Sequence, residues 1–340
     1  MRFLLDDEQR AFAHSLDALL TAADTPSVVR SWSAGDHTAG RALWSRIADA
    51  GVFALAVPEA YEGVGPLPVE LAVAFVELGR HAVPGPLVET VAAPALLTEP
   101  GLAKRFLPGL ASGETIATVA LNGSYALDGD AATLHLAVEG GEDGEGGKGG
   151  GELRLAQWHG HGHGQGQRQE HGPVRTSMDP ARRLTRLQED GGELLAAGPQ
   201  VAAAAAHSLT WARLATAAQA LGVGLTLLDR TVAYVKQRSQ FGVPIGSFQA
   251  VKHRLADAKV ALEFARPLLF GAALTMDPAD VAAAKVTACE AAYTTARTAL
   301  QLHGAIGYTA EYDLSLWLTK ARALRTAWGT PGECHELVLR

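Results

Sequence analysis

Two glycine-containing segments of the sequence combine side chains that could bind a phosphorylated ligand. The first, Arg238–Gln249, reads RSQFGVPIGSFQ and places a fixed positive charge beside a tight Gly/Pro turn. The second, Gln301–Tyr308, reads QLHGAIGY, and its glycines leave the backbone bare near a helix end. Arginine forms strong charge-assisted hydrogen bonds, and phosphate oxygens can approach a backbone that lacks Cβ atoms, so the two segments together would suit a diphosphate. On spacing alone, a helix-ending salt bridge and a tight turn explain them at least as well.

A third segment, Lys320–Leu337, raises a question about an aromatic residue. It reads KARALRTAWGTPGECHEL, in which a basic, helix-forming run stops at the four residues WGTP. Glycine and proline explain why a helix ends there. They do not explain Trp328, because a large ring at a helix end is expected to cover another group. A short acidic segment is expected after this break.

Four histidines in a glycine-rich stretch are the main candidates for metal ligands: His159, His161, His163 and His171. Imidazole binds Zn²⁺ and Ni²⁺ well, but a glycine-rich loop does not hold its ligands in place. We therefore expect no metal site. His303 and His335 are isolated, and we expect packing or surface residues there rather than acid–base catalysts.

Composition excludes several classes of protein. The chain has 340 residues, of which 19% are charged and 48% are hydrophobic, and its net charge is −7. A chain with this charge is not expected to be a general nucleic-acid binder, and no apolar run approaches the roughly 18 residues of a membrane span. The two cysteines, Cys289 and Cys334, predict no disulfide framework, and the N-terminus has no signal-peptide pattern. We therefore expect a cytoplasmic protein.

Hydrophobic spacing divides the chain into three predicted parts. Residues 1–113 read as helices, beginning with Asp6 and Gln9 as an N-cap pair. Residues 114–200 contain two short predicted strands, within 115–121 and 132–138, and then stretches rich in glycine and histidine. Residues 201–340 predict an antiparallel bundle of four long amphipathic helices.

The ends of the bundle helices are marked by local signals. The first helix is expected to end near Arg238 and the second near Pro267. Asp277 has the form of an N-cap before Pro278, which would open the third helix. Asp313–Ala327 would form the fourth. The expected fold is therefore mostly α with a small β-domain.

The order of these motifs resembles the acyl-CoA dehydrogenase family, which oxidises acyl-CoA thioesters at the α,β bond with FAD. The segments that carry the resemblance are Leu43-Trp44, Pro58–Gly63, Glu77–Arg80, Arg238–Gly242, Phe248-Gln249 and Gln301–Tyr312. They cover the N-terminal helices and the whole C-terminal bundle, whereas the β-domain is recognisable by position only. The resemblance implies an N-terminal helical domain, a middle β-domain and a C-terminal four-helix bundle.

In that family, residues of the two glycine-containing motifs reach across a dimer interface to the FAD of the neighbouring chain. The resemblance therefore implies a flavin-contacting set of Arg238, Gln240, Phe248, Gln249, Gln301, Gly304 and Thr330. It also places Arg213 beside the bound acyl group. This chain has alanine at position 305, where the family usually has a second glycine, and the added methyl group is expected to alter the approach of the phosphate.

The general base of the family is missing from this sequence. The family's last helix typically ends in Tyr-Glu-Gly-Thr, and Trp328 stands where that glutamate takes the α-proton. An indole has no lone pair available to accept a proton, and losing a positioned base costs about 10²–10⁴-fold in rate. Some members carry the base just before the arginine that Arg213 matches, but that residue is Ala212. Glu333 is the remaining candidate for a relocated base.

The β-domain also differs from the family at a segment that contacts the flavin. A Thr-Glu-Pro…Gly-Ser segment wraps the flavin in the family, and the matching region here reads VALNGS at 119–124. The chain thus resembles the short, base-lacking subunits of heterotetrameric acyl-CoA dehydrogenases from actinobacteria, which act on steroid side-chain CoA thioesters. The segment 178–184 (MDPARRL) also resembles that group. The resemblance implies an acyl-CoA substrate, a homologous base-containing partner subunit, FAD shared at their interface, and electron-transfer flavoprotein or a similar acceptor.

Two other interpretations stay open at this point. One is a self-sufficient flavoenzyme with Glu333 as its base. The other is a cofactor-free protein that kept the fold as a structural paralogue.

Overall fold

The computed structural model describes residues 5–140, 150–157 and 174–339. The histidines of the predicted glycine-rich stretch lie outside these residues. The chain forms two compact units, the first comprising residues 1–30, 68–83 and 213–340 and the second comprising 31–67 and 84–212. The predicted division at residues 113 and 200 stays a prediction.

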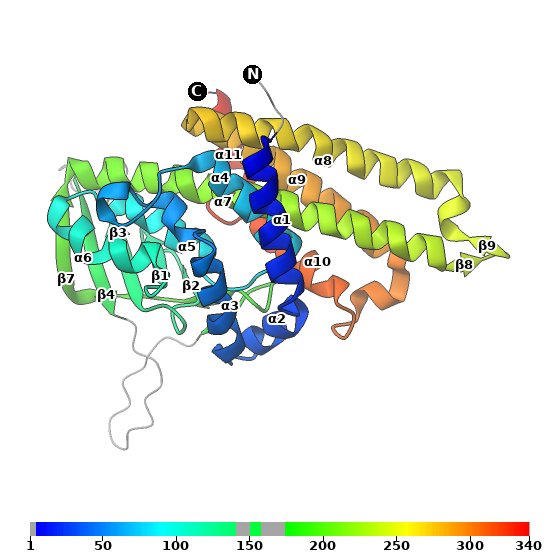
Figure 1. Ribbon diagram of the computed structural model, residues 1–340, viewed down its shortest axis with the longest axis horizontal. Helices are drawn as coiled ribbons and strands as arrows, with labels where there is room; N and C mark the ends of the chain where they lie inside the picture. Colours follow the sequence, from blue (N-terminus) through cyan, green and yellow to red (C-terminus); the bar gives the residue numbers. More distant parts are fainter. Residues whose placement is uncertain (1–4, 141–149, 158–173, 340) are drawn as a thin grey trace, which may run out of the picture. The chain divides into compact units, whose positions relative to one another are not determined.

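The first unit is helical. It contains α1 (Asp7–Thr21), α4 (Pro68–Arg80), α8 (Gln249–Thr275), α9 (Pro278–His303), α10 (Leu314–Leu324), α11 (Pro331–Leu339) and, from residue 213 onward, α7 (Pro199–Gln237). Figure 1 shows α8 and α9 running side by side, and the two helices pack along their lengths. No helix in the described residues combines the length and apolar character needed to cross a membrane.

Local capping signals predicted two of these helices correctly. The side chain of Asp6 accepts a hydrogen bond from the backbone N–H of Gln9, and the Gln9 side chain accepts one in return from the backbone N–H of Asp6. Asp277 caps α9 by accepting hydrogen bonds from the backbone N–H groups of Ala279 and Asp280. Each cap satisfies N–H groups that the first helical turn leaves without partners.

The prediction that the second bundle helix stops near Pro267 is wrong. Helix α8 continues through that proline to Thr275, and Leu262, Ala265 and Leu269 of this helix are fully buried. Proline removes one helical hydrogen bond, but burial of the apolar face on both sides of it keeps the helix continuous. The segment after Trp328 also differs from expectation, because it forms the helix α11.

Close backbone contact explains two glycines in the first unit. A Cβ atom on Gly222 of α7 would lie 1.9 Å from the carbonyl oxygen of Val76, and one on Gly79 of α4 would lie 2.1 Å from that of Gln219. Only glycine therefore lets α4 and α7 approach this closely. Nearby, the indole N–H of Trp317 donates a 2.8 Å hydrogen bond to the carbonyl of Arg80.

The second unit combines short helices with two small sheets. Its helices are α3 (Thr38–Asp49), α5 (Leu87–Ala92), α6 (Pro100–Ala111) and the first part of α7, and α2 (Thr25–Ser33) joins it to the first unit. The larger sheet has the order β1 (Ala117–Leu121), β3 (Leu134–Glu139), β4 (Gly151–Gln157), β7 (Gln188–Gly198). The smaller sheet has the order β2 (Ala126–Leu127), β6 (Arg183–Thr185), β5 (Arg175–Thr176). Both strands predicted from the sequence are thus present as β1 and β3, which pair in parallel.

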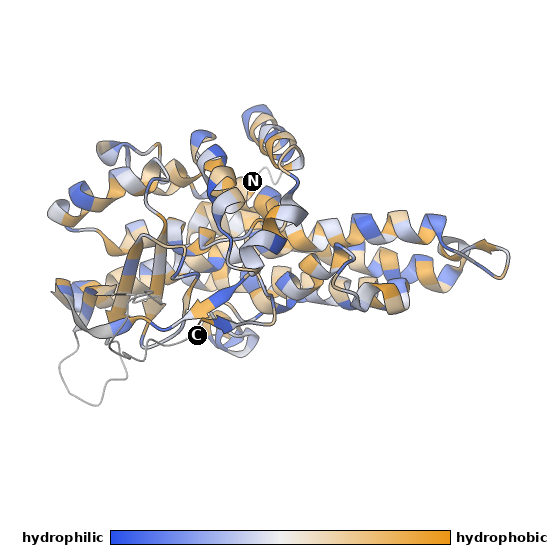
Figure 2. Cartoon of the chain, turned by 90° about the horizontal axis from the view of Figure 1, so that it is seen from below, coloured by the Kyte–Doolittle hydropathy of each residue, from blue (hydrophilic) through white to orange (hydrophobic). Residues whose placement is uncertain are grey.

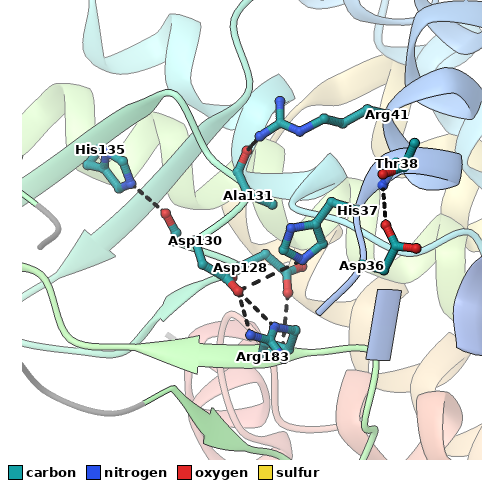
Figure 3. Close-up of polar contacts among 10 residues, drawn as sticks. Asp36, His37, Thr38, Arg41, Asp128, Asp130, Ala131, His135 and Arg183 are labelled. Atoms are coloured by element: carbon teal, nitrogen blue, oxygen red, sulfur yellow. Dashed lines mark hydrogen bonds and ion pairs between the residues drawn. The ribbon is translucent and has the colours of Figure 1, made fainter. Parts of the chain in front are cut away.

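A buried polar cluster ties the β2–β3 turn to β6 (Figure 3). The Asp128 carboxylate accepts a 3.1 Å hydrogen bond from the backbone N–H of Arg183, whose guanidinium Nε donates to Asp130 at 3.1 Å. The His37 ring nitrogen lies 3.8 Å from Asp130. Asp128 is fully buried, and this burial raises the pKa of its carboxyl to about 8. The cluster therefore holds a carboxyl group that is largely protonated at neutral pH.

Candidate functional site

The first glycine-containing motif forms the tip of the hairpin between α7 and α8. After α7 ends at Gln237, the strands β8 (Ser239–Gln240) and β9 (Val243–Pro244) pair, and the backbone N–H of Ile245 closes the turn with a 2.8 Å hydrogen bond to the carbonyl of Arg238. In both Figure 1 and Figure 2 this tip extends past the neighbouring helices of its unit. The predicted contacts at the tip are all exposed: Arg238, Gln240, Phe248 and Gln249.

Two aromatic rings lie uncovered at this tip. Phe241 is 91% exposed and Phe248 is 38% exposed, with their ring centroids 6.4 Å apart in an edge-on arrangement. Phe241 also has a positive φ of 54°, which a bulky side chain rarely adopts. Large apolar side chains that are exposed together are typical of surfaces that contact another molecule.

The second motif lines a surface groove between α8 and α9. The groove has a volume of about 540 Å³ and is lined by Arg254, Thr294, Arg297, Thr298, Leu300, Gln301, Gly304, Ala305 and Tyr308. Gly304 ends α9 with a positive φ of 65°, and a Cβ there would meet no atom within 4 Å. Of the predicted flavin contacts, the groove contains Gln301 and Gly304. The four at the hairpin tip do not line it.

Sequence reasoning missed the two arginines of this groove. Arg254 lies five residues after Gln249 on α8, and Arg297 lies four residues before Gln301 on α9. The spacing of four would have placed Arg297 on the same helix face as Gln301. That both arginines border one groove depends on how α8 and α9 pack, which the sequence does not reveal.

The turn that carries Trp328 is held through its main-chain carbonyls. Trp328 has a φ of 58° and Gly329 a φ of 126°. Arg213 donates from Nε to the carbonyl oxygen of Trp328 at 3.0 Å, and Lys285 donates from Nζ to that of Gly329 at 2.6 Å. Lys285, which is only 1% exposed, is a site residue that sequence reasoning did not identify. The turn thus keeps a fixed backbone although its side chain cannot accept a proton.

Thr330 and Glu333 form a capping box at the start of α11. The Glu333 carboxylate accepts hydrogen bonds from the backbone N–H and the hydroxyl of Thr330, at 2.6 Å and 3.0 Å. The Thr330 hydroxyl accepts one from the backbone N–H of Glu333 at 3.3 Å. These hydrogen bonds lower the pKa of Glu333. Its carboxylate is therefore ionised and engaged in capping, whereas a general base needs an oxygen directed at a substrate proton.

The remaining candidate residues show no feature of an acid–base or nucleophilic catalyst. Cys289 and Cys334 are free and buried, and burial raises the pKa of Cys289 to about 11, so its thiol is not an activated nucleophile. His303 is buried, its Nδ1 lies 2.8 Å from the carbonyl of Ala299, and burial lowers its pKa. The His335 side chain is exposed on α11. Ala212 is fully buried on α7.

Comparison with known proteins identifies what this arrangement is similar to. Residues 6–114 match the model of the acyl-CoA dehydrogenase N-terminal domain, and residues 202–336 match that of the C-terminal domain. Acyl-CoA dehydrogenase IpdE2 of Mycobacterium tuberculosis is 34% identical over 96% of this chain and 95% of its own length.

Solved structures with a similar fold include a complex and a steroid ACAD. The ChsE4–ChsE5 complex from Mycobacterium tuberculosis is similar with a TM-score of 0.84 and 26% identity, covering 100% of this chain and 98% of the other. A variant of the Tcur3481–Tcur3483 steroid ACAD has a TM-score of 0.80 and 24% identity, with 98% and 96% covered. The predicted fold, mostly α with a small β-domain, is confirmed.

Proposed function

Because the chain belongs to the acyl-CoA dehydrogenase family, we propose that it is a base-deficient subunit of a heteromeric flavoenzyme. In this proposal the partner subunit is a homologue that carries the glutamate base and binds most of the FAD. The present chain completes the flavin site of that partner. The assembly catalyses α,β-dehydrogenation of an acyl-CoA thioester.

The observation that carries the proposal is the type of residue at position 328, in a turn whose backbone is held by hydrogen bonds. Arg213 and Lys285 hold the backbone of the turn at Trp328 and Gly329, yet the side chain at the base position is an indole. The alternative base position is occupied by Ala212. Neither side chain can accept the α-proton, which supports a base supplied by another chain.

The exposed hairpin tip supports a role in completing a partner's site. Arg238 and Gln240 have side chains available for a diphosphate, and Phe248 offers an aromatic face to the rest of a flavin. Gln249, Gln301 and Gly304 add amide and backbone donors. Thr330 is exposed, but its hydroxyl belongs to the α11 cap, so it is the least available of the proposed contacts. FAD, when bound, would accept the hydride from the substrate.

The similar solved structures favour a second subunit as partner and a steroid thioester as substrate. The ChsE4–ChsE5 structure is a complex of two components, and the Tcur3481–Tcur3483 enzyme is a steroid ACAD. By analogy we propose a heterotetramer that acts on a steroid side-chain CoA thioester and passes electrons to an electron-transfer flavoprotein or a similar acceptor. Arg213 would lie beside the acyl group, with its Nε directed to the carbonyl of Trp328.

The flavin content of purified samples tests this proposal. The chain is expressed alone and together with a base-containing homologue encoded near it, and the flavin absorbance of each sample is recorded. We expect a colourless lone chain and a yellow complex with about one FAD per pair of subunits, as for a cofactor completed across an interface. A yellow lone chain that bleaches on addition of an acyl-CoA would refute the proposal and support a self-sufficient enzyme.

A further inference from the structure

We propose that Asp17, Glu77 and His81 form a binding site for a divalent transition-metal ion of the Zn²⁺ type, held between α1 and α4. The proposed function uses none of these residues, so this inference stands independently of it. All three belong to the first unit. The sequence does not suggest the set, because 64 positions separate Asp17 from His81.

The three side chains converge on one place. The backbone N–H of His81 donates a 3.2 Å hydrogen bond to the carbonyl of Glu77, so the last turn of α4 directs both side chains to one face. Asp17 reaches them from α1, and its Oδ1 lies 2.8 Å from the Nε2 of His81. One carboxylate oxygen of each acid and one ring nitrogen all lie within 4.8 Å of one another.

One imidazole nitrogen and two carboxylate oxygens are a suitable ligand set for Zn²⁺. An ion with bonds of about 2.0–2.2 Å holds its ligand atoms about 3.3–3.6 Å apart in a tetrahedron. The side chains of Glu77 and His81 are 14% and 16% exposed, whereas that of Asp17 is 50% exposed. Asp17 can therefore shift to complete the site, and its exposure gives the ion a path from solvent. Three protein ligands leave the fourth position of the tetrahedron for water.

The charges around the site favour a divalent cation. The Nε of Arg80 lies 3.6 Å from the Oε2 of Glu77, and the same guanidinium donates to Asp229 at 3.3 Å. With Asp17, three carboxylates thus surround one arginine, which leaves two negative charges when the His81 ring is neutral. A divalent ion would neutralise both.

A second cation near the site is paired within its own helix. Arg266 of α8 acts on Glu77 through its charge, and its Nε lies 3.9 Å from the Oε2 of Glu263 on the same helix. Its guanidinium therefore balances Glu263 rather than the carboxylates of the site. Arg80 is then the cation with which a bound metal ion competes for Glu77.

A metal ion in this place would join α1 to α4. The ligands come from two helices that meet only in the folded chain, so the unfolded chain would bind the ion weakly. Zn²⁺ should therefore raise the melting temperature as well as bind.

The experiment titrates zinc chloride into the full chain by isothermal titration calorimetry and follows the melting temperature by circular dichroism. The background for every form replaces four histidines by glutamine, so that the glycine-rich stretch contributes no ligand: His159, His161, His163 and His171. The variants added to this background are Asp17→Asn, His81→Gln and Arg80→Gln. His253→Gln, at an exposed position of α8, is the matched control for His81→Gln.

We expect the background chain to bind about one Zn²⁺ ion and to melt at a higher temperature when it is bound. Asp17→Asn and His81→Gln should each weaken binding by at least about 10-fold and remove the gain in melting temperature, because each deletes one of three ligands. Arg80→Gln should strengthen binding by roughly 3- to 10-fold, because the competing cation is gone. His253→Gln should keep the affinity of the background.

Equal affinity in the background, Asp17→Asn and His81→Gln forms would show an adventitious ion only and overturn the proposal. Absence of Zn²⁺ binding by the background chain would overturn it as well. If a ligand variant does not fold, as judged by its circular dichroism without metal, Arg80→Gln decides: stronger binding supports the site, and unchanged binding refutes it. These outcomes are separate from the flavin content that tests the proposed function.

Discussion

The side chain of Arg213 donates a 3.0 Å hydrogen bond to the carbonyl oxygen of Trp328, not to a carboxylate. One residue further on, buried Lys285 binds the carbonyl of Gly329 at 2.6 Å. Two basic side chains therefore bind consecutive carbonyls of the turn that is proposed to correspond to the family's base position. Side chains of helices α7 and α9 thus hold the backbone of this turn through its carbonyl oxygens.

Replacing Lys285 by methionine should destabilise the chain. The variant keeps most of the buried side-chain volume but leaves the Gly329 carbonyl without its charged donor, which costs about 1–3 kcal/mol. Urea unfolding followed by circular dichroism measures this difference. Lys259→Met, at an exposed position of α8, is the control and should change the free energy of unfolding by less than about 0.5 kcal/mol.

Changing Glu333 to glutamine should leave turnover of the complex intact. Glutamine can still take the second position of a capping box, so we expect a loss of stability below about 1 kcal/mol. Steady-state turnover of an acyl-CoA by the complex is measured for both forms. A fall of roughly 100-fold or more, with flavin retained, would identify Glu333 as the base and disprove the present proposal.

The complex should lose affinity between its subunits when Phe241 is replaced by serine. The ring is 91% exposed in the isolated chain, so its removal takes little from the core, and the melting temperature should change by less than about 2 °C. Co-purification with the partner should fall, together with flavin content. Met178→Ala, at a side chain that is 64% exposed in the second unit, provides the control. Unchanged assembly of the Phe241 variant would show that the tip is not an anchor.

Stability should fall as the pH rises through the titration of Asp128. Burial raises the pKa of this carboxyl from 3.8 to about 8, so between these values the folded chain keeps a proton that the unfolded chain releases. The free energy of unfolding contributed by this group therefore decreases from about pH 4 to about pH 8, by roughly 2–5 kcal/mol. Asn has no proton to release, so the Asp128→Asn variant should show a flatter pH profile. Asp257→Asn, on exposed α8, should keep the wild-type slope.

The sequence predicted those features that depend on neighbours along the chain. The Asp6–Gln9 and Asp277 caps, the β1 and β3 strands and the end of α7 all follow from signals within a few residues. The continuation of α8 through Pro267 does not, because burial of Leu262 and Leu269 against other helices decides it. The spacing of Thr330 and Glu333 is that of a capping box and signals helix α11, whereas Gly329 and Pro331 beside it indicate only a break.

In the candidate site, too, residues within sequence motifs were predictable, whereas residues brought together by helix packing were not. Motif resemblance predicted flavin contacts that lie at the exposed hairpin tip. It also predicted that Trp328 replaces the base, and both assignments stay predictions. It could not identify Arg254 or Arg297, because they border one groove only through the packing of α8 against α9. It could not identify Lys285 either, because this side chain on α9 binds a carbonyl of the turn at Gly329.

The main-chain anchoring of the Trp328 turn has an evolutionary consequence. Since Arg213 and Lys285 bind carbonyl oxygens, any residue able to adopt the positive φ of 58° leaves those contacts unchanged. Selection could then vary the chemistry of this position without rebuilding the fold around it. A gene duplicate released from catalysis could exchange a glutamate for an indole by changing two or three nucleotides of one codon, and its descendants could regain the glutamate by an equally short path.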